Sequence, residues 1–320
     1  MGNAWLGRGL CCIREGRSAE GRNDLQVAAT LEPQRAVFRS YLGKAFSQVG
    51  NARHARQELD LAVRLDPNDP TAFLYRALLN QQWNRPNEAV RDLEHSQELN
   101  DNRRVYRSSL LLDQDQAVRG ANLATVYRDA GMPEVSLREA GRAVSLDYAN
   151  YSAHLFLADS YNELRDPRQI NLRYETPWLT EYLVANLLAP PAAGTLSPFV
   201  TQQEYARLFE RNRFGFSSAT DYSSDGDWLQ TAAQHGLYEN FSYAAEMVYR
   251  SQHGYRPNQD FEQIIPTLRL KYQFTPQDSV FFQATYYDAE GGDVRPLYDQ
   301  SQANPFLRTR ETHEPLLLAG

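Results

Sequence analysis

Residues 42–67 read LGKAFSQVGNARHARQELDLAVRLDP and contain two helical patterns separated at Gly50. Positions 43 and 62 carry the small residues Gly43 and Ala62. Small residues are expected where two helices cross closely, because the crossing leaves little room for a side chain. The same residue types recur at a step of 34 residues: Gly9, Gly43 and Ala77; Ala28, Ala62 and Ser96; Leu25, Leu59 and Leu93. A period of 34 with small residues at fixed positions predicts stacked pairs of antiparallel helices.

The repeated pattern resembles the tetratricopeptide repeat (TPR). The matching positions are Trp5, Gly9, Leu25 and Ala28 in the first copy; Gly43, Phe46, Ala55 and Ala62 in the second; Ala77 and Ala89 in the third; Ala124, Tyr127 and Ala143 in the fourth; and Ala158 and Tyr161 in a fifth first helix. The fourth copy is displaced by 13 residues, which places an insertion near residues 103–115. No matching partner helix follows Asp166-Pro167. The resemblance implies a solenoid over residues 1–165, with about four repeats plus one helix.

The resemblance also implies what this half binds, because TPR solenoids offer a groove to proteins and peptides. One recognised use is a clamp for a C-terminal carboxylate, made of paired lysine, asparagine and arginine residues. The repeat helices carry one lysine, Lys44, so a chaperone-tail ligand is not expected. An ordinary helical bundle is the alternative for this half.

From Phe214 to Asp288 the hydrophobic period changes from 3.6 to 2 residues, which predicts β-strands. The expected strands are Phe214–Tyr222, Trp228–Gly236, Phe241–Arg250, Phe261–Phe274 and Val280–Asp288, with Pro315–Ala319 as a sixth. Short turns alternate with longer ones, and aromatic residues gather at strand ends. These features are typical of an outer-membrane β-barrel. A soluble antiparallel sheet with one buried face shows the same alternation and is the alternative.

The fold class expected for the chain is therefore α + β. A TPR solenoid precedes an incomplete antiparallel barrel over residues 213–320, and residues 166–212 join them as a helical linker. Within the linker, one short helix is expected from Trp178 to Leu188, and another opens at Thr201–Glu204 and continues to Arg211. Membrane barrels need about eight strands or more, so the sequence is interpreted as a fragment of a larger protein.

Strand alternation assigns the two faces of the predicted barrel. Ala245, Met247, Leu268 and Leu270 are expected to face lipid. The residues expected to face the lumen are Glu246, Arg250, Arg269 and Lys271.

Composition excludes several kinds of chemistry. A net charge of −7 argues against nucleic-acid binding, which requires a basic surface. The two cysteines, Cys11 and Cys12, are adjacent and are expected to be small buried apolar residues. The six histidines are too scattered for metal-ligand spacing, and there is no phosphate-binding loop or nucleophile elbow. No catalytic residue, cofactor or metal is predicted, and the chain is not expected to be an enzyme.

Acidic residues in the predicted outer loops leave two further hypotheses. Asp225, Asp227, Asp260, Glu290 and Asp293 are either Ca²⁺ ligands or, as is common in loops, solvated charges. A carbohydrate-active enzyme using Glu262 or Glu290 is a third function hypothesis, since glycosidases work with two carboxylates.

The order of the two halves resembles bacterial outer-membrane proteins with a periplasmic TPR solenoid, including export porins for exopolysaccharides. The resemblance implies an outer-membrane location with the TPR part in the periplasm. It also implies a protein or peptide ligand in the groove, membrane lipid around the barrel, and an anionic polysaccharide as the exported solute. The alternative function is a soluble TPR scaffold with a β-sandwich and no membrane role.

Overall fold

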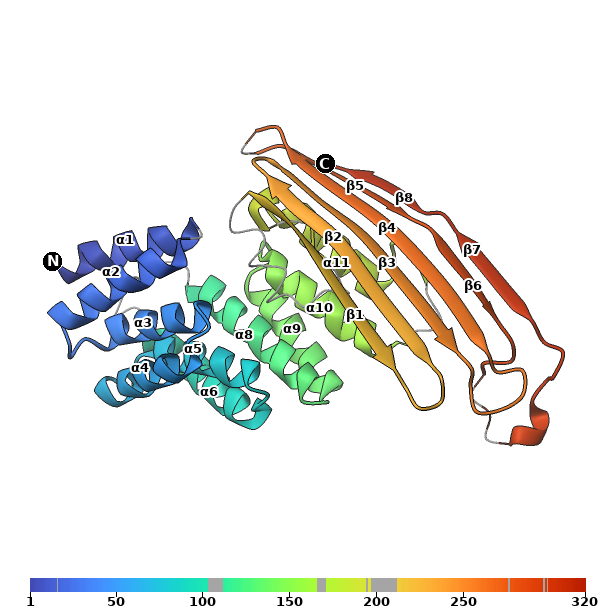
Figure 1. Cartoon of the computed structure of the whole chain (residues 1–320), viewed down its shortest axis with the longest axis horizontal. Helices are drawn as coiled ribbons and strands as arrows, with labels where there is room; N and C mark the ends of the chain where they lie inside the picture. Colours follow the sequence, from blue (N-terminus) through green and yellow to red (C-terminus); the bar gives the residue numbers. More distant parts are fainter. Residues whose placement is uncertain are drawn as a thin grey trace. The chain divides into compact units, whose positions relative to one another are not determined.

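The computed structural model describes residues 1–15, 17–102, 112–165, 171–193, 195–196, 212–275, 277–295, 297 and 299–320. The chain divides into two compact units (Figure 1). The helical unit comprises Met1–Arg165 and Pro177–Leu188, and the sheet unit comprises Asp166–Thr176 and Ala189–Gly320. The predicted helix from Thr201 to Arg211 lies outside the described residues.

Ten α-helices form the described part of the helical unit, and consecutive helices pack in pairs (Figure 1). They are α1 (Gly2–Arg14), α2 (Ser18–Leu31), α3 (Ala36–Gln48), α4 (Ala52–Leu65), α5 (Pro70–Gln82), α6 (Pro86–Glu98), α8 (Leu112–Asp129), α9 (Pro133–Leu146), α10 (Tyr151–Glu163) and α11 (Pro177–Leu188). A short 3-10 turn, η1 (Asn100–Asn102), follows α6. Most of the predicted insertion, residues 103–111, lies outside the described part of the chain, and the remainder begins α8.

Small residues set the crossing of each pair, as the repeat pattern predicts. A Cβ atom on Gly43 of α3 would lie 2.6 Å from Leu59 Cγ and 3.2 Å from the Ala55 carbonyl oxygen of α4. Capping residues and proline determine where helices begin. Asp69 caps α5 by accepting a hydrogen bond from the Thr71 amide at 2.9 Å, and Pro70 occupies the first helical position.

The fifth first helix, α10, has a partner, which differs from the single further helix expected from the sequence. A step of 34 from Pro133, the start of α9, reaches residue 167, but α11 begins ten residues later at Pro177. Its buried residues are Leu179, Tyr182, Ala185 and Asn186. The sequence predicts a linker helix from Trp178 to Leu188, but the helix packs on α10 without the repeat's alanine and leucine positions, so the periodicity could not reveal the pairing.

The described part of the sheet unit contains eight antiparallel strands. They are β1 (Arg213–Tyr222), β2 (Trp228–Tyr238), β3 (Phe241–Gln252), β4 (Phe261–Gln273), β5 (Ser279–Thr285), β6 (Tyr287–Gly291), β7 (Thr309–His313) and β8 (Leu316–Ala319). Thr267 pairs with Thr285 and Ile264 with Asp288, so β5 and β6 follow one register along β4. In the same way β7 and β8 follow one register along β6 and β5. The strands therefore make six rows, joined as a meander.

Loop length differs between the two ends of the sheet. Residues 223–227, 253–260 and 292–308 connect strands at one end, and residues 239–240 and 274–278 connect them at the other. The antiparallel meander thus gathers every long loop at one end, as the sequence predicts.

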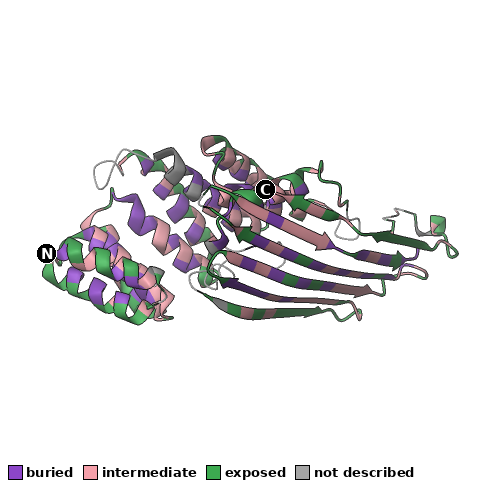
Figure 2. Cartoon of the chain, turned by 90° about the horizontal axis from the view of Figure 1, so that it is seen from above, coloured by how far each residue is buried: buried purple, intermediate pink, exposed green. Residues whose placement is uncertain are grey.

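The two faces of the strands differ in burial along their length (Figure 2). The sheet is not closed: β1 forms one border, and β7 with β8 forms the other. The architecture shown is therefore a helical solenoid followed by an open antiparallel sheet, and membership of a barrel remains a prediction.

Gly43→Ala should destabilise the chain by about 1–3 kcal/mol, because the added methyl group overpacks the crossing with Leu59. The control is Gly141→Ala in α9, where a Cβ would meet nothing within 4 Å and should stabilise the helix by about 0.5–1 kcal/mol. Chemical denaturation of both variants measures the difference. Equal effects would contradict the close crossing.

Candidate functional site

Neighbouring first helices of the solenoid contact one another through half-buried polar and aromatic side chains. Tyr41 of α3 and Tyr75 of α5 lie with ring centroids 5.8 Å apart. The Lys44 ammonium lies 4.8 Å from the centre of the Tyr75 ring, within cation–π range. Ser47 donates a hydrogen bond to Gln82 at 3.2 Å. The α3–α5 end of this row is therefore aromatic and cationic.

The contacts between neighbouring first helices continue from α5 to α8 and α10, where they include acidic residues. Gln81 of α5 donates to Asp129 at 2.9 Å, and Arg128 of α8 donates to Asp159 of α10 at 3.2 Å. Burial raises the pKa of Asp159 to about 7, against the opposing effect of Arg128. We call Tyr41, Lys44, Ser47, Tyr75, Gln81, Gln82, Arg128, Asp129 and Asp159 the first-helix ladder. It carries Lys44 at α3 and the ion pairs of Arg128 with Asp129 and Asp159 at α8 and α10.

A polar network replaces part of the apolar core in the third repeat. A step of 34 from Leu42 and Phe46 reaches Arg76 and Asn80 of α5. Arg76 donates two hydrogen bonds to Asp92, at 2.9 and 2.6 Å, and Asn80 donates a third at 3.1 Å. A cavity of about 360 Å³ opens beside this network. The sequence reasoning missed it, although Arg76 and Asn80 break the repeat pattern at two core positions.

The sheet carries large apolar side chains on one exposed face. Cross-strand pairing places them together: Phe214, Phe216, Tyr238, Met247, Leu268, Tyr272, Leu316 and Leu318. Phe216 is 70% exposed, Leu316 74% and Leu318 72%. Ala245 and Leu270 share this face, which we call the outer face.

The opposite face, which we call the inner face, is largely buried and mixed in polarity: charged side chains share it with an apolar cluster of Val248, Phe261, Ile265, Tyr287 and Ala289. Glu246, Arg269 and Lys271 are at most 5% exposed, and Arg250 is half-buried. Arg269 forms an ion pair with Glu246 and donates a hydrogen bond to Gln283 at 3.1 Å. These four polar residues, expected to face a lumen, therefore share one face opposite the four expected to face lipid.

Lys271 reaches a segment outside the strands. Its ammonium group donates to the carbonyl oxygen of Ala189, and burial lowers the pKa of Lys271 to about 8. The 3-10 turn η2 (Pro191–Ala193) lies against β3 and β4. The Ala189 contact is a tertiary one that no sequence pattern indicates.

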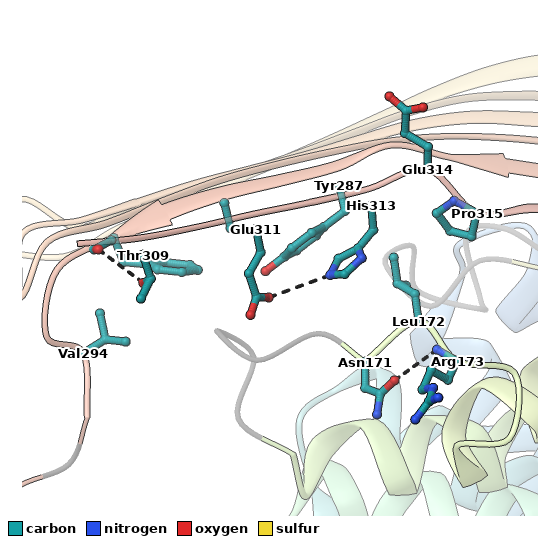
Figure 3. Close-up of a pocket in the computed structure, with 13 residues that line it drawn as sticks. Asn171, Leu172, Arg173, Tyr287, Val294, Thr309, Glu311, His313, Glu314 and Pro315 are labelled. Carbon is teal, nitrogen blue, oxygen red and sulfur yellow. Dashed lines mark hydrogen bonds and ion pairs between the residues drawn. The ribbon is translucent and has the colours of Figure 1, made fainter. Parts of the chain in front are cut away.

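A cavity of about 940 Å³ lies beside β6 and β7 (Figure 3). Tyr287 and His313 line it with ring centroids 5.6 Å apart, and His313 lies 3.9 Å from the Glu311 carboxylate. Asn171 and Leu172, from the segment before α11, lie opposite them (Figure 3). The cavity is lined by an imidazole, a carboxylate and an amide, together with apolar side chains that include Leu172, Phe261 and Ala289.

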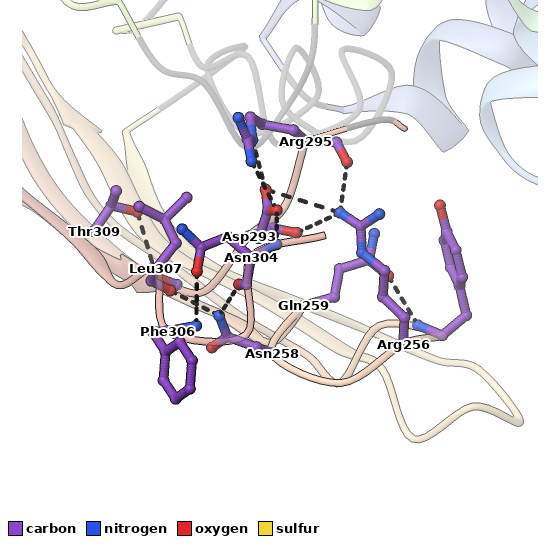
Figure 4. Close-up of polar contacts among 11 residues, drawn as sticks. Arg256, Asn258, Gln259, Asp293, Arg295, Asn304, Phe306, Leu307 and Thr309 are labelled. Carbon is purple, nitrogen blue, oxygen red and sulfur yellow. Dashed lines mark hydrogen bonds and ion pairs between the residues drawn. The ribbon is translucent and has the colours of Figure 1, made fainter. Parts of the chain in front are cut away.

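The long loops are held together by hydrogen bonds (Figure 4). Asn258 donates to the carbonyl oxygens of Asn304 and Leu307 at 2.8 and 2.9 Å. Asp293 accepts two hydrogen bonds from Arg295, at 2.7 and 2.9 Å, which hold the pKa of that carboxyl group well below its usual range. The two longest loops are thereby joined into one ordered surface.

The loop acids singled out in the sequence lie in different environments. Asp260 and Glu290 both accept from Arg308, at 2.7 and 3.2 Å. Asp227 accepts from the His253 amide at 2.9 Å, and Asp225 is exposed. Among the described residues, no group of three or more histidine, cysteine or acidic side chains is arranged to hold a metal ion.

The two carboxylates considered for glycosidase chemistry are cross-strand neighbours on the outer face. Glu262 accepts a hydrogen bond from the Tyr249 hydroxyl at 2.9 Å, and Glu290 is bound by Arg308. Both carboxylates therefore belong to a rim of polar contacts on that face.

The predicted repeat residues occupy the interior of the helical unit. Leu25, Ala28, Ala55, Ala62, Ala77, Ala89, Ala124 and Ala143 are fully buried, and Phe46 and Ala158 are at most 9% exposed. Gly9 and Gly43 are buried at helix crossings. Trp5, Tyr127 and Tyr161 are half-buried and pack against the core clusters.

No protein-family model matches the sequence, and no curated protein sequence matches it. Solved structures do resemble it. Cut9, in the hetero-tetramer of the APC/C proteins Cut9 and Hcn1, is 18% identical with a TM-score of 0.50, and the match covers 65% of this chain and 36% of that one. The chain thus spans about a third of that structure. The helical unit has the TPR fold.

Two other TPR structures show weaker likenesses. PilF from Pseudomonas aeruginosa is 17% identical with a TM-score of 0.47, over 59% of this chain and 76% of that one. A thermophilic TPR protein from Thermus thermophilus is 14% identical with a TM-score of 0.47, over 59% of this chain and 92% of that one. At 18% identity the likeness to Cut9 describes fold and not activity.

A buried histidine joins the last helix to the solenoid. His154 of α10 lies 2.5 Å from Glu181 of α11 through Nδ1 and 2.7 Å from the Tyr148 carbonyl oxygen through Nε2. Both partners accept hydrogen bonds, so the doubly protonated imidazolium satisfies both. Burial lowers the pKa of His154, but Glu181 and the Tyr148 carbonyl outweigh it, and the net pKa is raised above 6.5.

The His154–Glu181 contact makes the stability of the helical unit depend on pH. A raised folded pKa gives stability that is fully present below about pH 6.5 and is lost as pH rises through the folded value. Glu181→Gln should therefore lower the unfolding free energy by about 1.5–3 kcal/mol near pH 6 and by less near pH 9. Glu163→Gln, an exposed carboxylate on α10, is the control. A loss of the same size at both pH values would contradict the imidazolium contact.

Proposed function

We propose that the chain belongs to a bacterial outer-membrane protein. The sheet unit would lie in the membrane as part of a β-barrel, and the TPR unit would bind a protein or peptide partner in the periplasm. The observation that carries the proposal is that large apolar side chains are exposed on the outer face while charged side chains are buried on the inner face.

Water-soluble antiparallel sheets cover their apolar face and expose their polar face. Here Leu316 and Leu318 are exposed, while the Glu246–Arg269 ion pair is buried. An apolar surface that spans neighbouring strands marks an interaction with another surface or with lipid. Lipid accounts for the outer face, and a water-filled lumen accounts for the inner one.

The height of the apolar band supports the membrane. On β4 the outward residues from Ile264 to Tyr272 are apolar or aromatic, over eight residue steps. A rise of about 3.3 Å per residue gives about 26 Å along the strand, or about 20 Å at a tilt of about 40°. This approaches the apolar band of about 25 Å on known membrane barrels. Beyond Ile264 the outer face becomes charged at Glu262.

The loops support an orientation. Short turns of membrane barrels lie on the periplasmic side and long loops lie outside. Residues 239–240 and 274–278 would then face the periplasm, and the bonded loops 253–260 and 292–308 would face outwards. The proposal requires further strands to pair with β1 and with β7 and β8, because the described sheet is open.

The finer function within this class is exopolysaccharide export. Arg250, Arg269 and Lys271 supply cationic groups for an anionic polysaccharide on the inner face, which they share with the carboxylates Asp221, Glu246 and Glu311. The TPR unit would recruit a periplasmic partner along the first-helix ladder. No catalytic step is part of this function.

A soluble TPR scaffold is the second candidate, and the open borders of the sheet favour it. In that case a second sheet or another protein would cover the outer face. No helix in the described part of the chain is long and apolar enough to cross a membrane.

Leu270→Arg tests the assignment of the outer face to lipid. In the full-length protein in its membrane, a charge on the lipid face near the midplane should cost about 2–4 kcal/mol of unfolding free energy. Glu262→Arg is the matched control, since Glu262 lies on the same face of the same strand beyond the apolar band. The proposal fails if both variants fold into the membrane equally well.

Thiol labelling tests the orientation. Single cysteines at Gln277 and Ser301, in a Cys11→Ser, Cys12→Ser background, are exposed to an impermeant reagent on intact cells. Ser301 lies in the long loop and should be labelled, whereas Gln277 lies in a short turn and should not. Labelling of Gln277 without Ser301 would reverse the topology.

A further inference from the structure

The inner face of β3 and β4 is an unusual place for charge. Glu246 and Arg269 are buried as an ion pair, and Lys271 is 1% exposed. A buried ion pair is often replaceable by apolar residues without loss of stability, so its presence calls for another explanation. These charges would be explained if the inner face contacts water while the protein functions.

Unsatisfied polar atoms on the same face also indicate water. Glu246 Oε1 and Ser242 Oγ are buried and make no hydrogen bond with any described residue. Ser242 and Glu246 lie four residues apart on β3, and Lys271 is the cross-strand partner of Ser242. Buried polar atoms normally have a protein or water partner, so this face is incomplete as a dry interface.

One short segment of the sheet unit covers part of this face. Ala189 is 1% exposed and its carbonyl oxygen accepts from Lys271, while η2 lies against β3 and β4. The segment Ala189–Ala193 contains no charged side chain that could pair with the inner face. The Lys271 ammonium group is thus bonded to a neutral backbone carbonyl. In an open, hydrated state it would instead bind water or a solute.

We propose that Ala189–Ala193 is a displaceable strap over the inner face, and that its departure opens the Ser242–Glu246–Arg269–Lys271 surface to water and a hydrophilic solute. The inference rests on the proposed function for identifying that surface with a lumen. The hydrogen bond from Lys271 to Ala189 holds the strap in the closed position. Donors on Lys271 and Arg269 and the second carboxylate oxygen of Glu246 would all be available to a hydrated solute in the open one.

The chain offers a clean probe, because Lys44 and Lys271 are its only lysines. In a Lys44→Arg background, amine acylation followed across pH by peptide mass spectrometry reports both the accessibility and the titration of Lys271. Replacing Ala189–Ala193 with Gly-Ser-Gly-Ser-Gly should speed acylation of Lys271 about tenfold or more, as expected when a charge-assisted hydrogen bond and its cover are lost. Its titration midpoint should move from about 8 towards the ordinary lysine value near 10.5.

The matched control replaces Ser301–Ala303 in the long loop with Gly-Ser-Gly, which should leave Lys271 unchanged. If the strap replacement also leaves the rate and the midpoint unchanged, Lys271 is covered by something other than the strap and the proposal is overturned.

A second variant tests the proposal in case the chain with the replaced strap does not fold. Lys271→Met keeps the length of the side chain and removes the donor, with Lys44→Met as its control. Limited proteolysis between Leu188 and Leu196 should be about tenfold faster in Lys271→Met and unchanged in Lys44→Met. Equal cleavage of Lys271→Met and the parent chain would overturn the proposal. These assays use purified protein, so they can succeed or fail independently of the thiol-labelling test in cells.

Discussion

Strict alternation of side chains across long, register-locked strands is the constraint on which the sheet unit depends. Because β3 and β4 pair over twelve residue pairs, from Phe241↔Tyr272 to Gln252↔Phe261, a slip of one residue would exchange their two faces completely. The register thereby fixes an outer face with exposed apolar side chains and an inner face on which buried charged residues adjoin an apolar cluster. The outward side chains, the buried Glu246–Arg269 pair and the Lys271 contact all follow from it.

The helical unit depends on a different constraint, the close crossing of helices at small residues. Gly43 and Ala62 recur as equivalents every 34 residues, and this period sets the spacing of the first helices whose side chains form the ladder. Within that scaffold, Arg76 and Asn80 exchange apolar contacts for hydrogen bonds to Asp92. The TPR fold thus positions polar groups that the fold itself does not require.

Elements with strong local patterns could be predicted from the sequence, and tertiary contacts could not. The 34-residue step located α1 to α6, and the period of 2 located the first five strand rows to within a few residues; in the sixth row β8 was expected and β7 was not. Helix α11 was predicted as a linker helix from Trp178 to Leu188, but its role as the partner of α10 was not, because that role follows from packing and from the His154–Glu181 contact. The Lys271–Ala189 contact and the loop network around Asn258 join residues far apart in sequence, where no period exists. The network at Arg76 was readable as a break in the repeat, since charged and amide residues stand at core positions.

The central claim is that the outer face of the sheet meets lipid and the inner face meets water. Nitroxide spin labels at Leu268 and at Gln283, in the full-length protein in its native membrane, test this directly. Leu268 lies on the outer face, and Gln283 pairs with Arg269 on the inner one. The account predicts that oxygen, which concentrates in lipid, relaxes the Leu268 label more strongly, and that a water-soluble nickel chelate does not reach it. A Leu268 label relaxed by the nickel chelate as strongly as a label on the exposed loop at Ser301 would contradict the account.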